Sequence, residues 1–227
     1  MRLIYGYDFE TTGFPLWSKP SSDPGQPHIV QCAAVLVDAD TREIVSSFDL
    51  IARPEDWTIP DDVAEIHGIT TEYASEVGVL EERIVGNLFA FHKIASLRVG
   101  HNQPFDARIM RIAMKRFDRE PLADSWKEGE SYCTQKHSTP IVKCPPSAKM
   151  LAAGRKGNKT ANLGEAYEHF TGKKLEGAHT AMADTLACME VYWGIQDLEC
   201  AANPGSRNKV PDVPDEQGPG GDGVGFL

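Results

Sequence analysis

The stretch LIYGYDFETTG (residues 3–13) combines an apolar run with two carboxylates, Asp8 and Glu10, placed one residue apart. The apolar run predicts a buried first strand over Leu3–Phe9. Side chains on a strand alternate between its faces, so both carboxylates point the same way, with Cα atoms about 7 Å apart. Two such groups beside an apolar core repel each other unless a cation lies between them, and oxygen ligands favour Mg²⁺ or Mn²⁺. The alternative is a pair of solvated acids in a turn.

The rest of the chain predicts a mixed sheet covered by helices. Two β-rich runs follow the first strand and are joined by a hairpin-like turn at residues 38–41. Later segments carry apolar residues at helical spacing. Three consecutive strands followed by alternating helices and strands indicate an α/β fold. The expected elements are strands at 28–37, 43–51 and 97–100, and helices at 79–96, from 104 onward, at 162–170 and at 180–198.

Length and composition limit what the chain can be. Its 227 residues can bury one sizeable core, so we expect one domain over residues 1–202. Residues 203–227 are dominated by glycine and proline and predict a flexible C-terminal tail. No apolar stretch approaches the roughly 20 residues of a membrane helix, and the N-terminus does not resemble a signal peptide. We therefore expect a cytoplasmic protein without membrane contact, its five scattered cysteines reduced.

Two further motifs carry candidate functional residues. In GHNQPFDARIM (residues 100–110), Asp106 falls in the first turn of a helix, where an acid also complements the helix dipole. In GAHTAMADTL (residues 177–186), His179 precedes Asp184 by five residues. Five residues span about 140° of helical rotation, so His179 is expected on the loop ahead of the helix, from which it can approach the site of Asp184. A surface or capping histidine is the alternative.

Taken together, these motifs resemble the three exonuclease motifs of the DnaQ-like DEDDh 3′→5′ exonucleases. The matching residues are Asp8-Phe9-Glu10-Thr11-Thr12-Gly13, then His101-Asn102 with Phe105-Asp106, then His179 and Asp184 in H-x-x-x-x-D. Ile66-His67-Gly68-Ile69-Thr70 is similar to the H-G-I loop of the proofreading subunit of bacterial replicative polymerases. The resemblance covers roughly Leu3 to Leu198. It implies an RNase H-like fold with a central five-stranded mixed sheet flanked by α-helices.

The resemblance also implies a chemistry, which is hydrolysis of phosphodiester bonds from the 3′ end with release of nucleoside 5′-monophosphates. Two divalent metal ions, Mg²⁺ or Mn²⁺, are the implied cofactors, and such ions lie about 3.5–4 Å apart in two-metal sites. By resemblance, Asp8 bridges both ions. Glu10 and Asp184 complete the site on the nucleophile side, and Asp106 serves the other ion. His179 is the implied general base, because a histidine can accept a proton at neutral pH.

The family pattern further implies how the strand end is held. Atoms of Thr11 and Thr12 receive the terminal nucleotide, and Asn102 orients nearby groups. The implied walls of the base pocket are His67, Gly68, Ile69 and Phe105. Apolar walls and stacking do not distinguish between bases, so we expect trimming that is independent of sequence.

The net charge of −10 is unusual for a protein that binds phosphates. An exonuclease grips one strand end, however, and bound cations supply positive charge where the phosphate lies. Residues 131–164, here called the basic segment, also carry six lysines and arginines and no acid. One hypothesis is that Arg155, Lys156 and Lys159 contact the backbone of the incoming strand. The alternative is a solvated loop that happens to be basic.

Two positions depart from the family pattern. Gln31 stands where relatives often carry a glutamate, and Cys133-Thr134 replaces an aspartate–threonine pair. Neither position belongs to the implied catalytic set. Both weigh against close assignment to the polymerase subunit itself.

The sequence leaves several functions open. The 3′ end of DNA, in single strands or at primers, is the favoured substrate, and RNA trimming by an exoribonuclease or oligoribonuclease-like enzyme is the alternative. A stand-alone nuclease and a proofreading subunit tethered to a polymerase through the tail at 203–227 are both compatible with the sequence. A binding module without catalysis is expected to lose a carboxylate, and all four are present.

Overall fold

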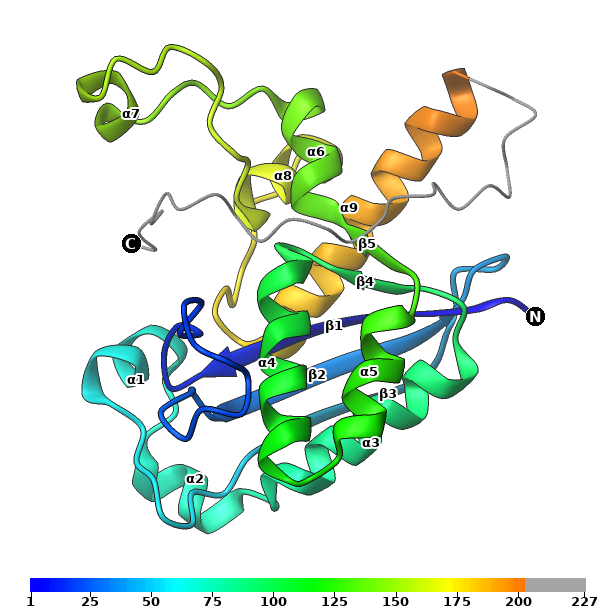
Figure 1. Cartoon of the computed structure of the whole chain (residues 1–227). Coiled ribbons are helices and arrows are strands. Elements are labelled where there is room, and N and C mark those ends of the chain that lie inside the picture. The colour runs from blue at the N-terminus through cyan, green and yellow to red at the C-terminus, as the bar shows by residue number, and fades with distance from the viewer. Residues whose placement is uncertain (203–227) are drawn as a thin grey trace.

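The computed structural model describes residues 1–202, and its centre is a five-stranded mixed sheet (Figure 1). The order across the sheet is β3-β2-β1-β4-β5, and β1 pairs antiparallel with β2 and parallel with β4. The predicted five-stranded mixed sheet is therefore confirmed. The strands are β1 (Leu3–Thr11), β2 (Ile29–Asp38), β3 (Ile44–Ile51), β4 (Arg98–Gly100) and β5 (Ser131–Cys133).

Helices cover both faces of the sheet (Figure 1). Helices α3, α4 and α5 pack on one face, and α6, α8 and α9 pack on the other. Helices α1 and α2 lie in the connection between β3 and α3. The helices of residues 1–202 are α1 (Asp61–His67), α2 (Thr71–Val77), α3 (Glu81–Ile94), α4 (Gln103–Arg116), α5 (Glu120–Glu128), α6 (Thr134–Val142), α7 (Ala148–Ala152), α8 (Leu163–Thr171) and α9 (Ala181–Ala202).

Strand β1 is buried on both faces, and its alternating residues divide between two apolar clusters. Tyr5, Tyr7 and Phe9 pack in the cluster that includes α3, α4 and α5. Ile4 packs in the cluster on the side of α9. Asp8 shares the α9 side with Ile4, because residues two or four apart on a strand point the same way. The apolar residues of β1 thus hold the strand in the core, and its acidic residues lie on the face toward α9.

Helix α9 approaches the sheet closely. A Cβ atom at Gly6 would lie 2.6 Å from Sδ of Met189, so this position of β1 has no room for a side chain while Met189 keeps its place. The hydroxyl of Thr185 donates a hydrogen bond of 3.2 Å to the carbonyl of Ala33 in β2. These contacts bring the neighbouring Asp184 to the face of β1 that carries Asp8.

The long periodic helices match their predictions to within a few residues, whereas several short elements were not predicted. Helices α1, α2 and α5 and strand β5 have nine residues or fewer, too few for a clear apolar period. The basic segment is also not a plain loop, because it contains β5, α6, α7 and the first residues of α8. Arg155, Lys156 and Lys159 lie on the connection between α7 and α8, so for these residues the alternative of a solvated loop stays open.

None of the helices within residues 1–202 is long and apolar enough to cross a membrane. The predicted tail at 203–227 lies outside the described residues.

Candidate active site

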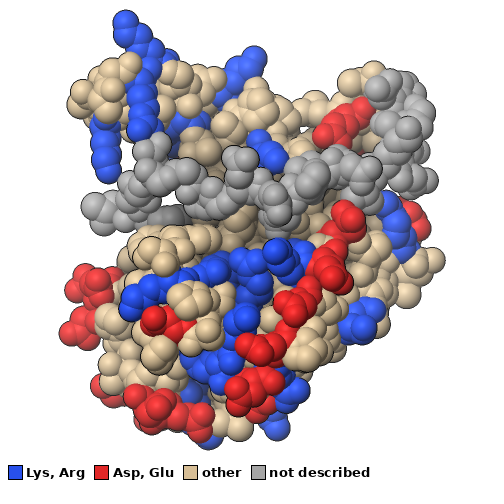
Figure 2. All heavy atoms as spheres, viewed as in Figure 1, with Lys and Arg blue, Asp and Glu red and all other residues tan. Residues whose placement is uncertain are grey.

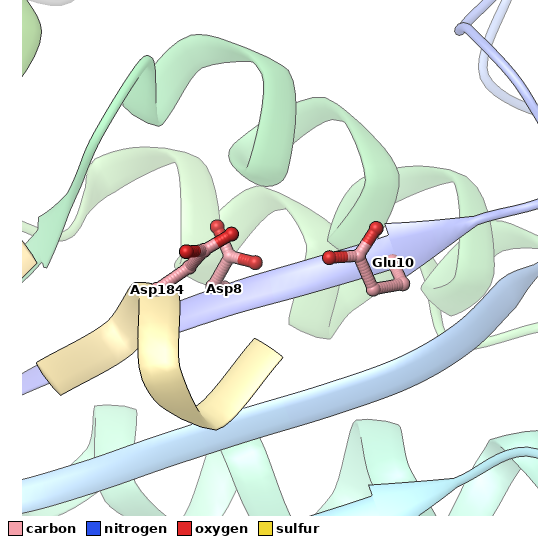
Figure 3. Close-up of side chains that lie close together, drawn as sticks. All are labelled: Asp8, Glu10 and Asp184. Carbon is pink, nitrogen blue, oxygen red and sulfur yellow. The ribbon is translucent and has the colours of Figure 1, made fainter. Parts of the chain in front are cut away.

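Three carboxylates converge at the C-terminal half of β1. Asp8 and Glu10 come from the strand, and Asp184 comes from the first turn of α9. One oxygen of each side chain lies within 4.8 Å of one oxygen of each of the others. Figure 3 shows the carboxylates of Asp8 and Asp184 beside each other and that of Glu10 further along the strand. This spacing is suited to oxygen coordination of a cation.

The electrostatics of the cluster disfavour three ionised carboxylates in the absence of a cation. Burial raises the pKa of Asp8 well above its usual range, and the charges of Asp106, Glu10 and Asp184 raise it further. Burial and the charge of Asp184 raise the pKa of Glu10 to about 7. A bound divalent cation would reverse this penalty, because it neutralises charges that otherwise repel each other.

Asp106 is the fourth carboxylate of the predicted set and lies in the first turn of α4, where only 2% of its surface is exposed. It is outside the group of three whose oxygens lie within 4.8 Å. Burial raises its pKa, while hydrogen bonds from the backbone of Phe9 and of Asp106 itself oppose the rise. Its charge is nevertheless the largest electrostatic influence on Asp8, so all four carboxylates belong to one electrostatic system.

The two oxygens of Asp184 have different surroundings. Oδ2 accepts a hydrogen bond of 3.1 Å from the backbone N–H of His179. Oδ1 is buried and has no hydrogen-bond partner among the described residues. Burial raises the pKa of Asp184, and the backbone and charge of His179 oppose the rise. A buried carboxylate oxygen without a donor fits a site that holds a cation.

His179 lies on the loop ahead of α9, where its side chain is exposed to solvent. Its backbone is left-handed, with φ of 68°, and Gly177 two residues earlier has φ of 67°. This turn aims the N–H of His179 at Asp184 and leaves the imidazole outside the carboxylate group.

Gln31 supports the site from β2 and was not predicted to do so. It is paired across the sheet with Glu10, and 7% of its surface is exposed. Its Oε1 accepts a hydrogen bond of 3.2 Å from the N–H of Ala181, the first residue of α9. Its Nε2 donates one of 2.7 Å to Oδ1 of Asp49 in β3. Gln31 therefore ties the start of α9 to the sheet, three residues before Asp184.

Thr11 and Thr12 follow the acidic strand, and both hydroxyls already make hydrogen bonds within the chain. Thr11 donates to the carbonyl of Gly13 at 2.8 Å. The hydroxyl of Thr12 accepts from the N–H of His28 at 2.9 Å, and its own N–H donates to the carbonyl of His28. The pairing of β1 with β2 also shifts register between Glu10 and Thr11. The hydroxyls of Thr11 and Thr12 thus stabilise the turn after β1.

The H-G-I segment ends helix α1. Gly68 has φ of 76°, which favours glycine, and caps the helix through its N–H. The ring Nδ1 of His67 accepts a hydrogen bond of 3.1 Å from the N–H of Ile69. Nε2 of His67 is buried and has no hydrogen-bond partner among the described residues. Burial lowers the pKa of His67, and the charge of His179 lowers it further, which places this segment on the His179 side of the site.

Asn102 and Phe105 lie at the start of α4. Asn102 is left-handed, with φ of 62°, and its carbonyl accepts from the N–H of Phe105. The ring of Phe105 meets the edge of Phe14, with centroids 6.1 Å apart.

Arg155, Lys156 and Lys159, which were predicted to contact the incoming strand, differ in their surroundings. Arg155 and Lys156 are exposed on the connection after α7. Nζ of Lys159 instead lies 2.6 Å from both carboxylate oxygens of Glu165, which in turn caps α8. Figure 1 shows α7 and its flanking connections projecting away from the sheet. The ammonium of Lys159 is therefore engaged in a structural ion pair.

Comparison with protein-family models finds the exonuclease model RNase_T over residues 5–192. Comparison with curated proteins gives no match. Among solved structures, the chain is similar to exonuclease I, in a structure described as suggesting how processivity is achieved (TM-score 0.66, 19% identity). It is also similar to E. coli exonuclease I in complex with a dT13 oligonucleotide (TM-score 0.66, 17% identity). Both matches cover 90% of this chain and 42% of the other.

A product-bound structure of exonuclease I matches as well, with TM-score 0.65 and 18% identity, over 87% of this chain and 44% of the other. The chain thus spans less than half the length of the exonuclease I chains that it matches. At these identities the likeness establishes the fold, and it confirms the predicted RNase H-like architecture. The family model matches most of the 227 residues and includes Asp8, Glu10, Asp106 and Asp184. This protein therefore belongs to the RNase_T exonuclease family, which confirms the predicted DnaQ-like resemblance.

Proposed function

We propose that this chain removes nucleotides one at a time from the 3′ end of single-stranded DNA and releases nucleoside 5′-monophosphates. The observation that carries the proposal is the half-buried group of Asp8, Glu10 and Asp184 within an exonuclease domain. Family membership implies divalent metal ions. The choice of two ions, and of Mg²⁺ or Mn²⁺, belongs to the proposal, and it is supported by a donor set made of carboxylate oxygens.

Each carboxylate has a proposed place in the metal site. Asp8, whose pKa is raised by burial and by the other three carboxylates, would hold both ions. Glu10 and Asp184 complete the site on the nucleophile side, and the donor-free Oδ1 of Asp184 is available for this contact. Asp106 serves the second ion. When bound, the ions neutralise charge on the phosphate and the leaving group and make water a better nucleophile at neutral pH.

His179 is the proposed general base. Its backbone N–H holds Asp184, so the loop that carries the imidazole is tied to the edge of the metal site. The exposed ring can turn toward a phosphate at the site and accept the proton of the attacking water. His179 thus takes a proton from the attacking water, whereas the carboxylates bind the metal ions.

The strand end is proposed to lie between the turn after β1 and the start of α4. Because the hydroxyls of Thr11 and Thr12 are engaged within the chain, backbone atoms of this turn are the better candidates for contact with the terminal nucleotide. Asn102 orients groups at the start of α4. The proposed pocket walls are His67, Gly68, Ile69 and Phe105. Single-stranded DNA is favoured as substrate because structures of exonuclease I that share this fold hold dT13 and dA16 oligonucleotides.

The test is a time course with the purified full chain and 5′-labelled single-stranded DNA, RNA and primer–template duplex. Each substrate is incubated with Mg²⁺, with Mn²⁺ and with EDTA. We expect a ladder that shortens from the 3′ end of single-stranded DNA, requires a divalent ion and is slower on RNA. RNA shortened faster than DNA would favour the exoribonuclease alternative.

Histidine variants test the proposed base. His179→Ala should slow cleavage by about 10²–10⁴-fold, the usual contribution of a general base. His169→Ala is the matched control, because His169 is an exposed histidine on α8. Intact label in every lane that contains Mg²⁺ or Mn²⁺ would contradict the enzymatic proposal and favour a binding module. A polymerase partner engaged through residues 203–227 stays a prediction, because those residues lie outside the described structure.

A further inference from the structure

Two of the four carboxylates reach the candidate active site from helices rather than from the central strand. Asp106 lies on α4 and Asp184 on α9, and these helices pack on opposite faces of the sheet (Figure 1). Apolar packing holds each helix against its own face, but it does not by itself fix one carboxylate relative to the other. Side chains that join the two helices at the end of the sheet would do so.

Side chains that could join them meet at the carboxyl ends of β4 and β5. These strands are parallel, and their register pairs Gly100 with Cys133. The residues that follow the two strand ends therefore lie side by side, and Nδ1 of His101 is 2.9 Å from Oγ1 of Thr134. His101 comes two residues before the start of α4, and Thr134 is the first residue of α6.

The hydroxyl of Thr134 also reaches α9. Its Oγ1 lies 3.4 Å from Sγ of Cys188, and both residues are buried, with 0% and 1% of their surfaces exposed. Cys188 comes four residues after Asp184, so the two share one face of α9. Burial raises the pKa of the Cys188 thiol, and the charges of Asp8 and Asp106 raise it further, which places the thiol close to the carboxylates.

The direction of each hydrogen bond follows from the groups involved. Nε2 of His101 lies 3.2 Å from the carbonyl oxygen of Ala161, which can only accept, so Nε2 carries the hydrogen. Burial lowers the pKa of His101 to about 4, so the ring is neutral at neutral pH and Nδ1 accepts from the hydroxyl of Thr134. The carbonyl of Gly100 is a more distant acceptor for this hydroxyl, at 3.3 Å. Because the hydroxyl has one hydrogen, the thiol of Cys188 is the donor to Oγ1 of Thr134.

The ring of His101 is held from its other side as well. Ala161 is fully buried, and its own N–H donates a hydrogen bond of 3.2 Å to the hydroxyl of Thr139 in α6. The carbonyl that accepts from His101 therefore belongs to a residue with a fixed place in the core. A ring bound at both nitrogens cannot turn without leaving a buried polar group unpaired, which is unfavourable.

We propose that the chain of hydrogen bonds from Cys188 through Thr134 to His101, here called the interhelix link, positions the two helix-borne carboxylates relative to each other. The proposal rests on the proposed function, in which these carboxylates serve different metal ions. The three residues of the link are positioning residues, because they act on the ions only through Asp106 and Asp184. Replacing residues that orient metal ligands typically weakens metal binding. The link therefore affects metal binding in a way that a hydrogen bond elsewhere in the core does not.

The first test compares metal-free crystal structures of the wild-type full chain, of Thr134→Val and of Ser138→Ala. Valine has nearly the shape of threonine but no hydroxyl, so Thr134→Val breaks the link at its centre. Catalytic groups have to be held within about 0.5 Å of their working positions. The distance between the carboxylates of Asp106 and Asp184 should change by at least this amount in Thr134→Val, and an unchanged distance would overturn the proposal.

Ser138→Ala is the matched control. Ser138 is a fully buried residue of the same helix, and its hydroxyl donates to the carbonyl of Gln135 rather than to a residue of the link. Its loss should leave the distance between the two carboxylates unchanged. An equal change in Ser138→Ala and Thr134→Val would overturn the proposal, because it would indicate a general loosening of α6.

The second test measures metal binding without nucleic acid, by isothermal titration calorimetry of the full chain with Mn²⁺. Thr134→Val should weaken Mn²⁺ binding by about tenfold or more, the lower end of the effect of replacing a residue that orients metal ligands. Thr134→Ser keeps the hydroxyl and should bind Mn²⁺ nearly as well as the wild type. Wild-type affinity in Thr134→Val would overturn the proposal. Equal losses in the two variants would also overturn it, because the methyl group rather than the hydroxyl would then matter.

Steady-state cleavage of single-stranded DNA gives a third readout. In Thr134→Val, kcat should fall by about tenfold to 100-fold, since misplacing a catalytic group by about 1 Å has an effect of this order. KM should stay nearly unchanged, because the residues proposed to hold the strand are not part of the link. A change confined to KM would contradict the proposal.

Cys188 provides a second way to break the link if Thr134→Val does not fold. Cys188→Ala removes the donor at the α9 end, whereas Cys188→Ser retains one. Cys188→Ala should change the distance between the two carboxylates and weaken Mn²⁺ binding, and Cys188→Ser should stay close to the wild type. An unchanged distance in Cys188→Ala would then overturn the proposal.

The crystal structures separate this proposal from the proposed function. They report the distance between the carboxylates of Asp106 and Asp184 whether or not the chain cleaves nucleic acid. If the wild-type chain cleaves no substrate, the proposed function fails, and a changed distance in Thr134→Val still supports the interhelix link. An unchanged distance in a chain that cleaves DNA would overturn the link alone.

Discussion

At the scale of single residues, the site places carboxylates close together although they repel each other. Asp8 lies on a strand whose neighbours are apolar, and its pKa is raised both by burial and by three other carboxylates. Such an arrangement costs stability unless an opposite charge is present, and no lysine or arginine pairs with Asp8 among the salt bridges of the described residues. The cluster therefore makes sense as a cation site.

Replacing Asp8 with asparagine should separate stability from activity. In EDTA, Asp8→Asn removes a charge that three carboxylates repel, so the free energy of unfolding should rise. A gain of about 1 kcal/mol corresponds to a rise in Tm of about 2–4 °C for a chain of this size. Cleavage should fall by at least about 10²-fold, because a metal ligand is lost. Differential scanning fluorimetry and the gel assay measure the two effects. Asp124→Asn, an exposed aspartate on α5, should change neither. A lower Tm in EDTA for Asp8→Asn would contradict the electrostatic account.

The pH dependence of the metal-free protein follows from Glu10. Its pKa is raised to about 7 in the folded chain, above the ordinary value near 4.5, so the folded state binds more protons than the unfolded state between these values. Stability in EDTA should therefore be highest at low pH within this window and fall as pH rises through about 7. The Tm gained on adding Mg²⁺ should increase over the same interval, because protons compete with the cation. A Tm in EDTA that rises from pH 5 to pH 7 would contradict this assignment.

At the scale of elements, the site depends on how α9 docks against the sheet. Gln31 satisfies a donor on α9 and an acceptor on β3 with one amide group. A carboxylate at this position could accept from Ala181 but could not donate to Asp49, and it would add charge beside Glu10. The glutamine at this position is thus explained by Asp49 within this chain.

Gln31→Glu should therefore be harmful here. We expect a loss of about 1–3 kcal/mol in the free energy of unfolding, because the new carboxylate oxygen at the buried position 31 would face Asp49 without a donor. Cleavage should also be slower, because the start of α9 positions Asp184. Urea unfolding and the gel assay provide the two readouts. Adding Asp49→Asn to the same chain supplies a donor and should restore most of both losses. If the double variant is no better than Gln31→Glu alone, the pairing with Asp49 is not the reason for glutamine.

At the scale of the whole molecule, the net charge of −10 is unevenly distributed. Acidic side chains run along α5, while basic side chains gather on the projecting connections around α7 (Figure 2). The chain can therefore hold a phosphate backbone on one part of its surface although its total charge is negative. Lys159 is paired with Glu165, so a test of such contact can leave Lys159 in place and change the other two basic residues of this connection.

The double variant Arg155→Ala with Lys156→Ala tests this contact. It should raise KM for single-stranded DNA and reduce the slope of log affinity against log salt by roughly 1.4, the value expected for two lost phosphate contacts. Steady-state cleavage or anisotropy over a salt series measures the slope. Arg83→Ala with Lys127→Ala removes the same charge from α3 and α5 and should leave the slope nearly unchanged. An equal change in both double variants would point to net charge rather than to contact.

The sequence by itself determined the long periodic elements, the mixed sheet and the identity of the four carboxylates, because the periods are local and each carboxylate lies within a short motif. The short elements α1, α2, α5 and β5 were not predicted, since their few residues show no clear apolar period. Only the tertiary structure decided which groups meet across long separations. Examples are Gln31 with Ala181 and Phe14 with Phe105, in which packing rather than local pattern selects the partner.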